Sequence, residues 1–317
     1  MLLITFYAFI FIVFLQLLYY LVIFGRFAFV KITLGTPKRL AVSVIVCAKN
    51  EAKNVSKFVP LLAAQNYPDF EIILIDDASS DNTLDIFEEF ERQYSNIRLV
   101  KVQNNEAFWA NKKFALTLGI KAAKNEYLLF TDADCRPDSE NWINEMSSHF
   151  TLKKTIVLGY GAYEKIAGSF INKIIRFETM LTAVQYFSWA KAGKPYMGVG
   201  RNLAYKREEF FKTNGFIDHM KIRSGDDDLF INQAATKNNT AISFNPAGFT
   251  YSEPNTTYKD WFNQKRRHVS TASHYKAFDK IQLSLFFISQ FMFFVVAIIL
   301  LAFLYEWIIV LSLIGFR

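Results

Sequence analysis

The sequence contains very little cysteine, since only Cys47 and Cys135 occur among its 317 residues. Both lie at the ends of predicted strands, and they lack the close, repeated spacing of metal-binding cysteines. Disulfides are also rare in proteins that work in a reducing compartment. The sequence therefore predicts a chain without a disulfide or a cysteine-rich metal site.

Motifs for binding nucleic acid are also absent. No segment combines aromatic and basic residues in a pattern typical of DNA or RNA recognition, and the net charge of +7 is modest. The basic residues concentrate beside two long apolar segments. We therefore expect membrane lipids with anionic headgroups, or phosphorylated ligands, as partners, and no nucleic acid.

Charged residues are missing from two long segments near the ends of the chain. Hydrophobic residues make up 52% of the sequence, with 33 phenylalanines, and they concentrate in residues 2–24 and 283–304. Each segment is long enough to cross a bilayer as a helix. A cleaved signal peptide is the alternative for the first one, but no basic region precedes it and no small-residue cleavage site follows it. We predict an N-terminal transmembrane helix over residues 1–25 and C-terminal transmembrane segments over residues 283–316. The last run, residues 307–316, is too short to span a bilayer comfortably alone.

Basic residues flank both apolar segments on the side of the polar middle of the chain. They are Arg26, Lys31, Lys38, Arg39, Arg266, Arg267, Lys276 and Lys280. Such residues favour the cytoplasmic side of a membrane. The sequence thus predicts an integral protein of a bacterial inner (cytoplasmic) membrane, with its polar domain in the cytosol.

Buried strands alternate with amphipathic helices between residues 40 and 256. After a break at Gly35-Thr36-Pro37, short continuous apolar runs are typical of strands that are covered on both faces. The predicted strands are residues 42–47, 72–75, 97–102 and 128–131. Helical spacing of apolar residues follows each of the first three, and Asn104-Asn105 precedes the third helix. The pattern predicts one α/β domain with a largely parallel sheet, whose ligands bind beyond the carboxyl ends of the strands.

Polar residues stand at the ends of three of these strands. They form the groups Asn50-Glu51, Asp76-Asp77 and Asp132-Ala133-Asp134. Each group alone is also typical of a turn or a helix cap. Their repeated position at one edge of one sheet favours a shared polar site. Because side chains alternate along a strand, Asp132 and Asp134 would share one face where the extended backbone persists, and two carboxylates there suit a divalent cation.

Two motifs follow in the second half of the chain. The run Gly198-Val199-Gly200-Arg201 is rich in glycine, but it lacks the strand-to-helix context of a nucleotide-binding loop. The run Gly225-Asp226-Asp227-Asp228 places three adjacent acids before a helix. A favourable interaction with the helix dipole accounts for one of these acids and hardly for all three.

Residues 257–280 form a candidate amphipathic helix just before the second apolar segment, with the sequence Gln264-Lys265-Arg266-Arg267-His268. Such a helix usually lies at the membrane interface with its basic face on the headgroups. The alternative is that Arg266 or Arg267 turns inward and binds a diphosphate, because the guanidinium group matches paired phosphate oxygens.

Taken together, and in this order ahead of a membrane span, these motifs resemble the membrane-bound family 2 glycosyltransferases. The resemblance covers roughly residues 40–277 and implies the GT-A fold, a Rossmann-like α/β domain that binds a nucleotide-sugar. It also implies transfer of the sugar, from a uridine or guanosine diphosphate sugar (UDP- or GDP-sugar), with inversion at the anomeric carbon.

The resemblance assigns roles to individual residues. Those for binding the nucleotide are Asn50, Glu51, Asp76, Asp77 and Asp132. Asp134, with Asp132, would bind Mg²⁺ or Mn²⁺, which offsets the charge of the leaving diphosphate. Asp227 would be the general base, with Asp226 and Asp228 as alternatives, because three adjacent acids leave the register open by one residue. Those for binding the diphosphate or the acceptor are Gln264, Arg266, Arg267, Gly200 and Arg201. His268 stands where the family has tryptophan in its chain-building synthases, which weakens the expectation of a processive enzyme.

The sequence thus predicts an inverting, metal-assisted glycosyltransferase of the hexosyltransferase type. Its acceptor would be membrane-associated, either a glycolipid or a precursor of a cell-envelope polysaccharide. The alternatives within the enzyme class are a processive polysaccharide synthase and a transferase that charges polyprenyl phosphate with a sugar. The alternative from another class is a non-catalytic membrane subunit that binds nucleotide-sugars. The retention of every acidic cluster argues against it, because an idle site gains nothing from mutually repelling carboxylates.

Overall fold

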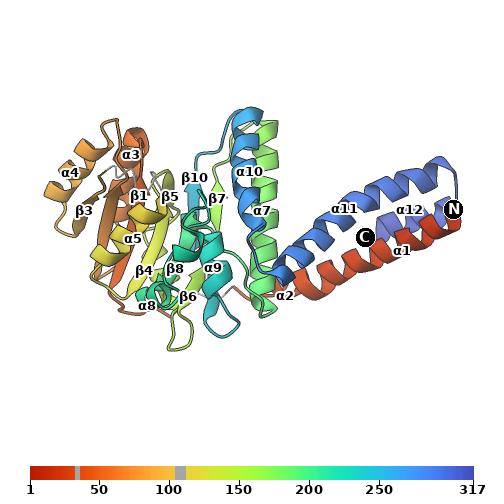
Figure 1. Ribbon diagram of the computed structural model, residues 1–317, viewed down its shortest axis with the longest axis horizontal. Helices are drawn as coiled ribbons and strands as arrows, with labels where there is room; N and C mark the ends of the chain where they lie inside the picture. Colours follow the sequence, from red (N-terminus) through yellow and green to blue (C-terminus); the bar gives the residue numbers. More distant parts are fainter. Residues whose placement is uncertain (33–35, 104–111) are drawn as a thin grey trace. The chain divides into compact units, whose positions relative to one another are not determined.

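The computed structural model describes residues 1–32, 36–103 and 112–317 (Figure 1). Gly35 of the expected break and the pair Asn104-Asn105 lie outside the described residues. The chain divides into two compact units. The larger unit comprises residues 31–274, and the smaller unit comprises residues 1–30 and 275–317.

The main sheet of the larger unit has seven strands among the described residues (Figure 1). In spatial order they are β3 (Ile97–Lys101), β2 (Phe70–Asp76), β1 (Val42–Ala48), β4 (Tyr127–Asp132), β8 (Leu203–Lys206), β6 (Ile156–Leu158) and β9 (Thr240–Ile242). Strand β8 runs antiparallel to both of its neighbours, whereas all other neighbouring strands are parallel. The predicted α/β domain with a largely parallel sheet is therefore confirmed.

The pairing register of the central strands brings the polar strand ends together. At the end of β1, Ala48 pairs with Asp76 of β2, and Cys47 pairs with Asp132 of β4. The three polar groups predicted from the sequence thus leave the sheet at the same level. This edge is where open parallel sheets bind their ligands.

A second, smaller sheet begins directly after the last of these groups. Its strands, in spatial order, are β5 (Cys135–Pro137), β10 (Thr250–Ser252) and β7 (Gly161–Tyr163). Because β4 ends at Asp132 and β5 begins at Cys135, Asp134 lies in the turn between the two sheets.

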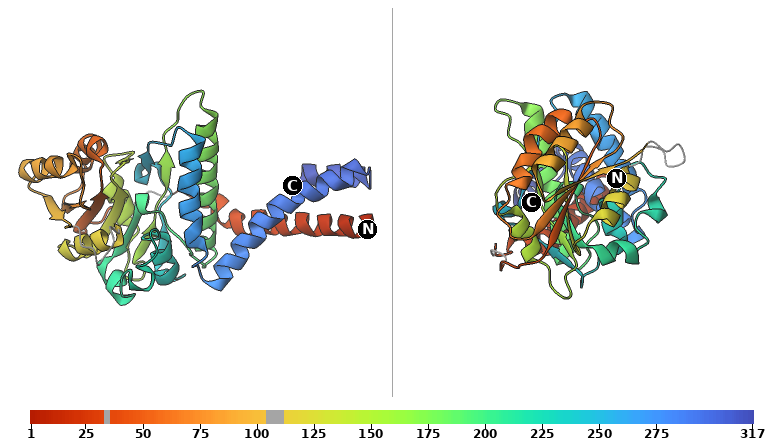
Figure 2. Two further views of the ribbon diagram at one scale, coloured as in Figure 1. Left: turned by 45° about the horizontal axis from the view of Figure 1, so that its top comes forward. Right: turned by 90° about the vertical axis from the view of Figure 1, so that its left-hand side faces the viewer.

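The helices of the larger unit are α3 (Ala52–Ala63), α4 (Thr83–Gln93), α5 (Lys112–Ala122), α6 (Trp142–Ser148), α7 (Phe170–Lys191), α8 (Arg207–Lys212), α9 (Asp228–Ala234) and α10 (Tyr258–Ala272). Short 3₁₀ turns are η3 (Gly200–Asn202), η4 (Ile217–His219) and η5 (Pro246–Gly248). Helices α7 and α10 lie side by side in every view (Figures 1 and 2), joined by Glu178 of α7, which contacts both Trp261 and Lys265 of α10. Helix α4 is capped by Asp81, whose carboxylate accepts a hydrogen bond from the Thr83 N–H, and not by the side chain of Asn82.

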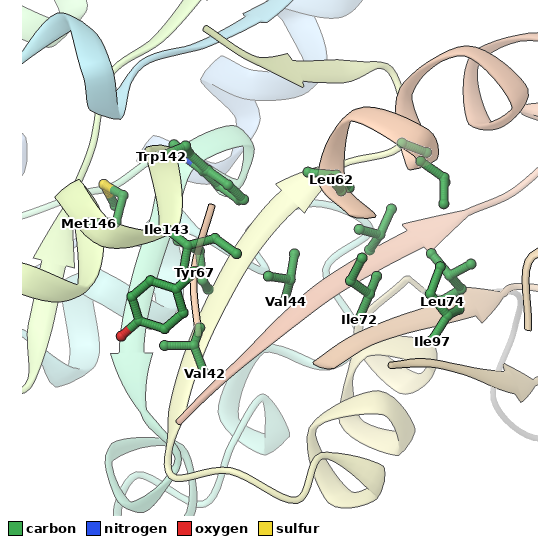
Figure 3. Packing of buried hydrophobic residues seen from close by; sticks show 14 of the residues in the cluster. Val42, Val44, Leu62, Tyr67, Ile72, Leu74, Ile97, Trp142, Ile143 and Met146 are labelled. Carbon is green, nitrogen blue, oxygen red and sulfur yellow. The ribbon is translucent and has the colours of Figure 1, made fainter. Parts of the chain in front are cut away.

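Alternate residues of the central strands build the core on the sheet face that α3, α4 and α6 cover (Figure 3). Val44 of β1 and Ile72 of β2 belong to this cluster, together with Leu62 of α3 and Trp142 of α6. Full burial of a side chain of this kind stabilises the folded protein by about 1.5–3 kcal/mol relative to leaving it exposed. The intervening strand residues face helix α5 on the other side, which explains why the strand sequences are continuously apolar.

Helix α5 approaches the sheet most closely at Gly119. A Cβ atom at this position would lie 2.2 Å from Cδ1 of Ile75 on β2, well inside van der Waals contact. Replacing Gly119 with alanine should therefore lower the free energy of unfolding by about 1–3 kcal/mol, although alanine favours a helix by about 1 kcal/mol. Thermal unfolding of the variant measures this effect. The matched control is Gly315→Ala in another helix, where a Cβ meets no atom within 4 Å, and an equal effect at both positions would contradict the packing argument.

The smaller unit consists of helices. They are α1 (Leu2–Leu17), the π-helical segment η1 (Leu18–Phe24), α2 (Gly25–Ala28), α11 (Ala277–Ala302) and α12 (Trp307–Phe316). Phe9 and Val13 of α1 pack against Phe293 of α11 and Val310 of α12. By length and composition, the continuous helices over residues 2–28 and 277–302 could each cross a membrane.

The segment predicted as an interfacial helix, residues 257–280, is divided between the two units. Helix α10 belongs to the larger unit, and the last four residues of the segment begin α11 of the smaller unit.

Candidate active site

Lys112 joins two acidic groups that lie far apart in the sequence. Its ammonium group, in the first turn of α5, lies 2.7 Å from Asp132 Oδ1 and 3.1 Å from Asp226 Oδ2. The strand-end pair and the acid triple therefore meet at one place. Burial opposes the charge on Lys112, but Asp132 and Asp226 outweigh it and hold the pKa of Lys112 well above its usual range. Burial would likewise raise the pKa of Asp132, yet Lys112 outweighs it, and the pKa of Asp132 is lowered.

The sequence predictions did not include Lys112 in the site. One signal could have found it: Lys112 and Lys113 open a helix, where a positive charge opposes the helix dipole. In the structure, both lysines bind groups outside helix α5, and Lys112 pairs with Asp132 and Asp226. Lys113 is buried and donates hydrogen bonds to the carbonyl oxygens of His219 and Ile222. The pair thus anchors both the acid triple and the segment that leads to it.

Removing the charge of Lys112 should destabilise the site. In a Lys112→Met variant, Asp132 and Asp226 would face each other without the intervening cation, and we expect the free energy of unfolding to fall by about 1–2 kcal/mol, since the groups are partly exposed. Added Mg²⁺ should restore part of the loss. Thermal unfolding with and without Mg²⁺ measures both effects, with Lys121→Met at an exposed position of the same helix as the control. Equal stability of the two variants would show that the bridge contributes nothing.

A second cluster lies at the turn between β4 and β5. Ligand atoms of Asp132, Asp134 and Cys135 lie within 4.8 Å of one another. Burial, and then the charge of Asp132, raise the pKa of Asp134 to about 6. Burial also holds the pKa of the Cys135 thiol well above its usual range, and its sulfur lies 2.9 Å from Ser252 Oγ. The Cys135 thiol has Ser252 as a hydrogen-bond partner, and Asp132 and Asp134 supply the oxygen ligands of the cluster. Hard cations such as Mg²⁺ and Mn²⁺ prefer such oxygen ligands.

The three acids of the triple have different environments. Asp226 pairs with Lys112, as described above. Asp228 is buried, accepts a hydrogen bond from the Leu229 N–H at 2.7 Å, and contacts the Thr271 hydroxyl. Asp227 accepts hydrogen bonds from two backbone N–H groups, those of Gly200 at 2.6 Å and Asp228 at 2.7 Å. Burial, followed by the charges of Asp226 and Asp228, raises the pKa of Asp227 to about 7. Asp227 thus exchanges its proton near neutral pH.

The nucleotide residues predicted from the sequence occupy the loops after β1 and β2. Asn50 adopts a left-handed backbone with φ of 57°, and its side-chain oxygen accepts hydrogen bonds from the N–H and hydroxyl of Ser80. This pins the two loops to each other. Glu51 accepts a hydrogen bond from Asn54 within the first turn of α3.

Asp76 and Asp77 end strand β2 at the same edge. Both are buried, and the Asp76 carboxylate accepts a hydrogen bond from the Ser79 N–H. Burial raises the pKa of Asp77, although Lys49 lies 3.8 Å away. The edge therefore presents carboxylates that can accept hydrogen bonds from a nucleobase or ribose.

The glycine-rich run contributes turn η3 to the site. Gly200 packs against Asp227, and a Cβ at this position would lie 3.3 Å from the Asp227 carboxylate. The guanidinium carbon of Arg201 lies 4.3 Å from the centre of the Tyr163 ring, and the backbone oxygen of Arg201 accepts hydrogen bonds from Thr131 and Thr250. The side chain of Arg201 makes no ion pair within the described residues. It is a fixed cation close to the charges of Asp132 and Asp134.

Helix α10 presents different residues to the site and to the outside. Gln264 bonds to Tyr163, and Thr271 contacts Asp228, so these positions face the site. His268 lies between them at helical spacing. Arg266 and Arg267 are both exposed, and Arg266 lies about 200° around the helix from Gln264.

A small cavity of about 20 Å³ opens beneath the acids. It is lined by Ile45, Cys47, Lys112, Leu116, Phe130, Thr131, Asp132, Gly200, Leu203, Tyr205, Phe216, Asp226 and Asp227. Its walls combine apolar core residues with the charged groups of the site, so the acids lie at the boundary between the core and the polar edge of the sheet.

Comparison with known proteins places this chain among sugar-transferring proteins. Residues 43–230 match the family described as glycosyl transferase family 2. The chain is 26% identical, over 192 residues, to the dolichyl N-acetyl-α-D-glucosaminyl phosphate 3-β-D-2,3-diacetamido-2,3-dideoxy-β-D-glucuronosyltransferase of Methanococcus voltae, which is 58% of this chain and 55% of that protein. It is 27% identical, over 241 residues, to the probable glycosyltransferase YdaM of Bacillus subtilis, which is 71% of this chain and 54% of that protein. The chain thus spans about half the length of these relatives.

The fold is shared with a solved mannosyltransferase. The structure of PcManGT from Pyrobaculum calidifontis, in complex with GDP-Man and Mn²⁺, superposes with a TM-score of 0.69 and covers 95% of this chain and 86% of its own. The sequences are 20% identical. The likeness is one of fold.

Proposed function

Because this chain belongs to glycosyl transferase family 2 and has the predicted GT-A fold, we propose that it transfers a sugar, with inversion, from a nucleoside-diphosphate sugar to a membrane-associated acceptor. The observation that carries the proposal is the meeting of Asp132, Asp134, Asp227 and Arg201 at one edge of the sheet, with Lys112 between the acidic groups. A base, a cation site and a fixed positive charge are the groups that displacement of a diphosphate requires.

In this proposal, the first half of the domain binds the donor. Asp76 or Asp77 accepts hydrogen bonds from the nucleobase, Asn50 and Glu51 lie in the adjoining loop, and Asp132 faces the ribose. The donor is a UDP- or GDP-sugar. The protein of similar fold, PcManGT, is described with GDP-Man.

Asp134 and Asp132 would hold Mg²⁺ or Mn²⁺. When bound, such a cation supplies positive charge beside the diphosphate as the glycosidic bond breaks. Asp134 itself lies at the turn that begins the second sheet, so its carboxylate is directed by rigid strands on both sides.

Asp227 is the general base of the proposed reaction. It takes the proton from the acceptor hydroxyl while that oxygen attacks the anomeric carbon from the face opposite the diphosphate. Two observations support this choice: Asp226 pairs with Lys112, whereas burial raises the pKa of Asp227 to about 7.

Arg201 and Arg267 are proposed to bind the leaving diphosphate, with Gly200 allowing close approach. Guanidinium groups bind phosphate oxygens in pairs. Gln264 borders the same region, and Arg266 is better placed to meet lipid headgroups from the exposed side of α10. His268 stands where chain-building relatives have tryptophan, which supports the addition of a single sugar.

The acceptor is proposed to be a glycolipid or a precursor of a cell-envelope polysaccharide. The Methanococcus relative is named as acting on a dolichyl-linked sugar phosphate. Two features support a membrane location: helices over residues 2–28 and 277–302 are apolar enough to span a bilayer, and α10 exposes Phe262 and Val269 beside Arg266. We propose that these helices anchor the chain in the inner membrane, that residues 40–256 form the catalytic domain in the cytosol, and that α10 lies along the interface.

The decisive experiment screens UDP- and GDP-sugars for release of nucleoside diphosphate by the purified full-length protein, with and without Mg²⁺ or Mn²⁺. Metal-dependent release with one donor is the expected result. Thermal stabilisation by a nucleotide-sugar without any release would instead indicate a non-catalytic binding subunit. Products formed on a lipid extract then distinguish the enzymes, because a single glycolipid means one addition and a ladder means a processive synthase. Labelled polyprenyl phosphate as the product would indicate the third alternative.

A further inference from the structure

We infer that helix α10 holds two groups of the site in place: Arg201, the proposed phosphate-binding cation, and Asp227, the proposed base. It does so through Tyr163 and Thr271, which act as positioning residues. The inference rests on the proposed function and extends it to residues that touch neither substrate. It assigns Gln264 an indirect role, in place of direct contact with the acceptor or the diphosphate.

The side-chain amide of Gln264 already has partners on both of its atoms. Its oxygen accepts a hydrogen bond from Asn255 at 3.1 Å, and its nitrogen donates one to the Tyr163 hydroxyl at 3.2 Å. Asn255 lies just before α10, and Tyr163 ends strand β7. The amide therefore fastens the helix to the second sheet, and direct substrate contact would require breaking these bonds.

Tyr163 in turn fixes Arg201. The buried ring lies under the guanidinium group, whose carbon is 4.3 Å from the ring centre. Gly161 on the same strand permits this approach, because a Cβ there would lie 3.0 Å from Cβ of Arg201. The Nη1 atom of Arg201 also donates to Ala162 at 3.3 Å. The same Nη1 atom donates a hydrogen bond to Ser252 Oγ at 3.4 Å. These contacts hold the stacked guanidinium in one place before an anion binds.

The other end of α10 fixes the acid triple. The Thr271 hydroxyl contacts the Asp228 carboxylate, which also accepts a hydrogen bond from the Leu229 N–H. Asp227, the proposed base, is the next residue and caps α9. Gln264 and Thr271 are seven residues apart, which is close to two helical turns, so one rigid helix carries both contacts on one face.

The consequence is that α10 fixes the separation between a phosphate-binding cation and a base. Groups that stabilise a transition state act best when they are already in place before the reaction. Loosening either contact should therefore reduce turnover more than it weakens binding of the donor.

The first test uses Tyr163→Phe, which keeps the ring under Arg201 and removes the hydroxyl that bonds to Gln264. We expect kcat to fall about five- to tenfold with little change in donor KM, as for one lost hydrogen bond. Gln264→Ala should have a similar effect, and the double variant should be no worse than Gln264→Ala alone. Tyr258→Phe, at an exposed position of α10, is the matched control. If Tyr163→Phe turns over like the wild type while Gln264→Ala is inactive, Gln264 contacts the substrate and the inference is wrong.

The second test does not depend on turnover. Amide hydrogen exchange of the full-length protein should increase over residues 199–203 in Tyr163→Phe and over residues 224–229 in Thr271→Val, with unchanged exchange in the control Thr256→Val, which alters an exposed threonine before α10. Unchanged exchange in both segments would overturn the inference, even if the protein proved to be inactive on every donor. Failure of the proposed function alone would leave the exchange differences in place.

Discussion

Replacing Asp227 with asparagine should lower kcat by about a thousandfold, since general base catalysis typically contributes a factor of 10²–10⁴. Asparagine has nearly the same shape and can still accept the hydrogen bond from the Gly200 N–H, although its amide nitrogen cannot accept the one from the Asp228 N–H. Release of nucleoside diphosphate in the presence of acceptor measures the loss. Asp218→Asn, at a carboxylate that bonds to Gln233 away from the site, is the control. Retention of more than a tenth of the wild-type rate would move the role of base to Asp226 or Asp228.

The pH dependence of the reaction follows from the same group. The pKa of Asp227 is raised to about 7, and a general base must be deprotonated to act. Wild-type kcat should therefore rise with pH and level off above about pH 7. The stability of the protein should change in the opposite sense. A carboxyl group whose pKa is raised by folding is penalised when it is ionised, so Asp227→Asn should gain stability over the wild type as the pH rises from 4 to 8.

Replacing Asp134 with alanine should lower turnover by about a hundred- to thousandfold, which corresponds to the several kcal/mol that a bound cation contributes to stabilising a leaving group. Asp134 has no cation as an ion-pair partner within the described residues, whereas Asp132 is already neutralised by Lys112. The variant should therefore lose most of the affinity for the metal. Titration of the nucleotide-bound protein with Mn²⁺, followed by thermal unfolding, measures this loss directly.

The control for this variant is Asp138→Ala. Asp138 is an exposed carboxylate just beyond the same turn, paired with Arg136. The Asp138→Ala variant removes one negative charge close to the position of Asp134. A general electrostatic effect would therefore lower turnover in both variants. If Asp134→Ala keeps its response to Mn²⁺, the cation is held elsewhere and the assignment of Asp134 as a ligand is wrong.

Local patterns in the sequence were sufficient to predict an α/β domain with a largely parallel sheet. The strands around Val44, Ile73 and Leu129 are continuously apolar because helices cover both faces of the sheet, and this pattern can be read without a structure. Polar strand ends such as Asp76 and Asp132 were also predictable, because parallel strands deliver their carboxyl ends to one edge.

The contacts between distant segments could not be predicted in this way. No local pattern shows that Lys112 reaches both Asp132 and Asp226, because the partners come from three separate segments that only the sheet order brings together. The same holds for Tyr163, which looks like an ordinary residue of a short strand until Arg201 and Gln264 are seen on either side of it. Assignment within the acid triple was open for the same reason, since adjacent aspartates differ only in their partners.

The antiparallel strand β8 divides the main sheet into two parts that could be exchanged independently of each other. Strands β3, β2, β1 and β4 pair with one another in parallel, and within the described part of the chain they join the rest of the sheet where β4 pairs with β8. The residues proposed to bind the nucleotide lie on the first part, while the acid triple and α10 follow β8 in the chain. Recombination between relatives at the β4–β8 boundary would exchange the part with the acid triple and α10, while keeping the part proposed to bind the nucleotide. The boundary between β4 and β8 is therefore the position at which to join two relatives in a hybrid enzyme that uses one donor with a new acceptor.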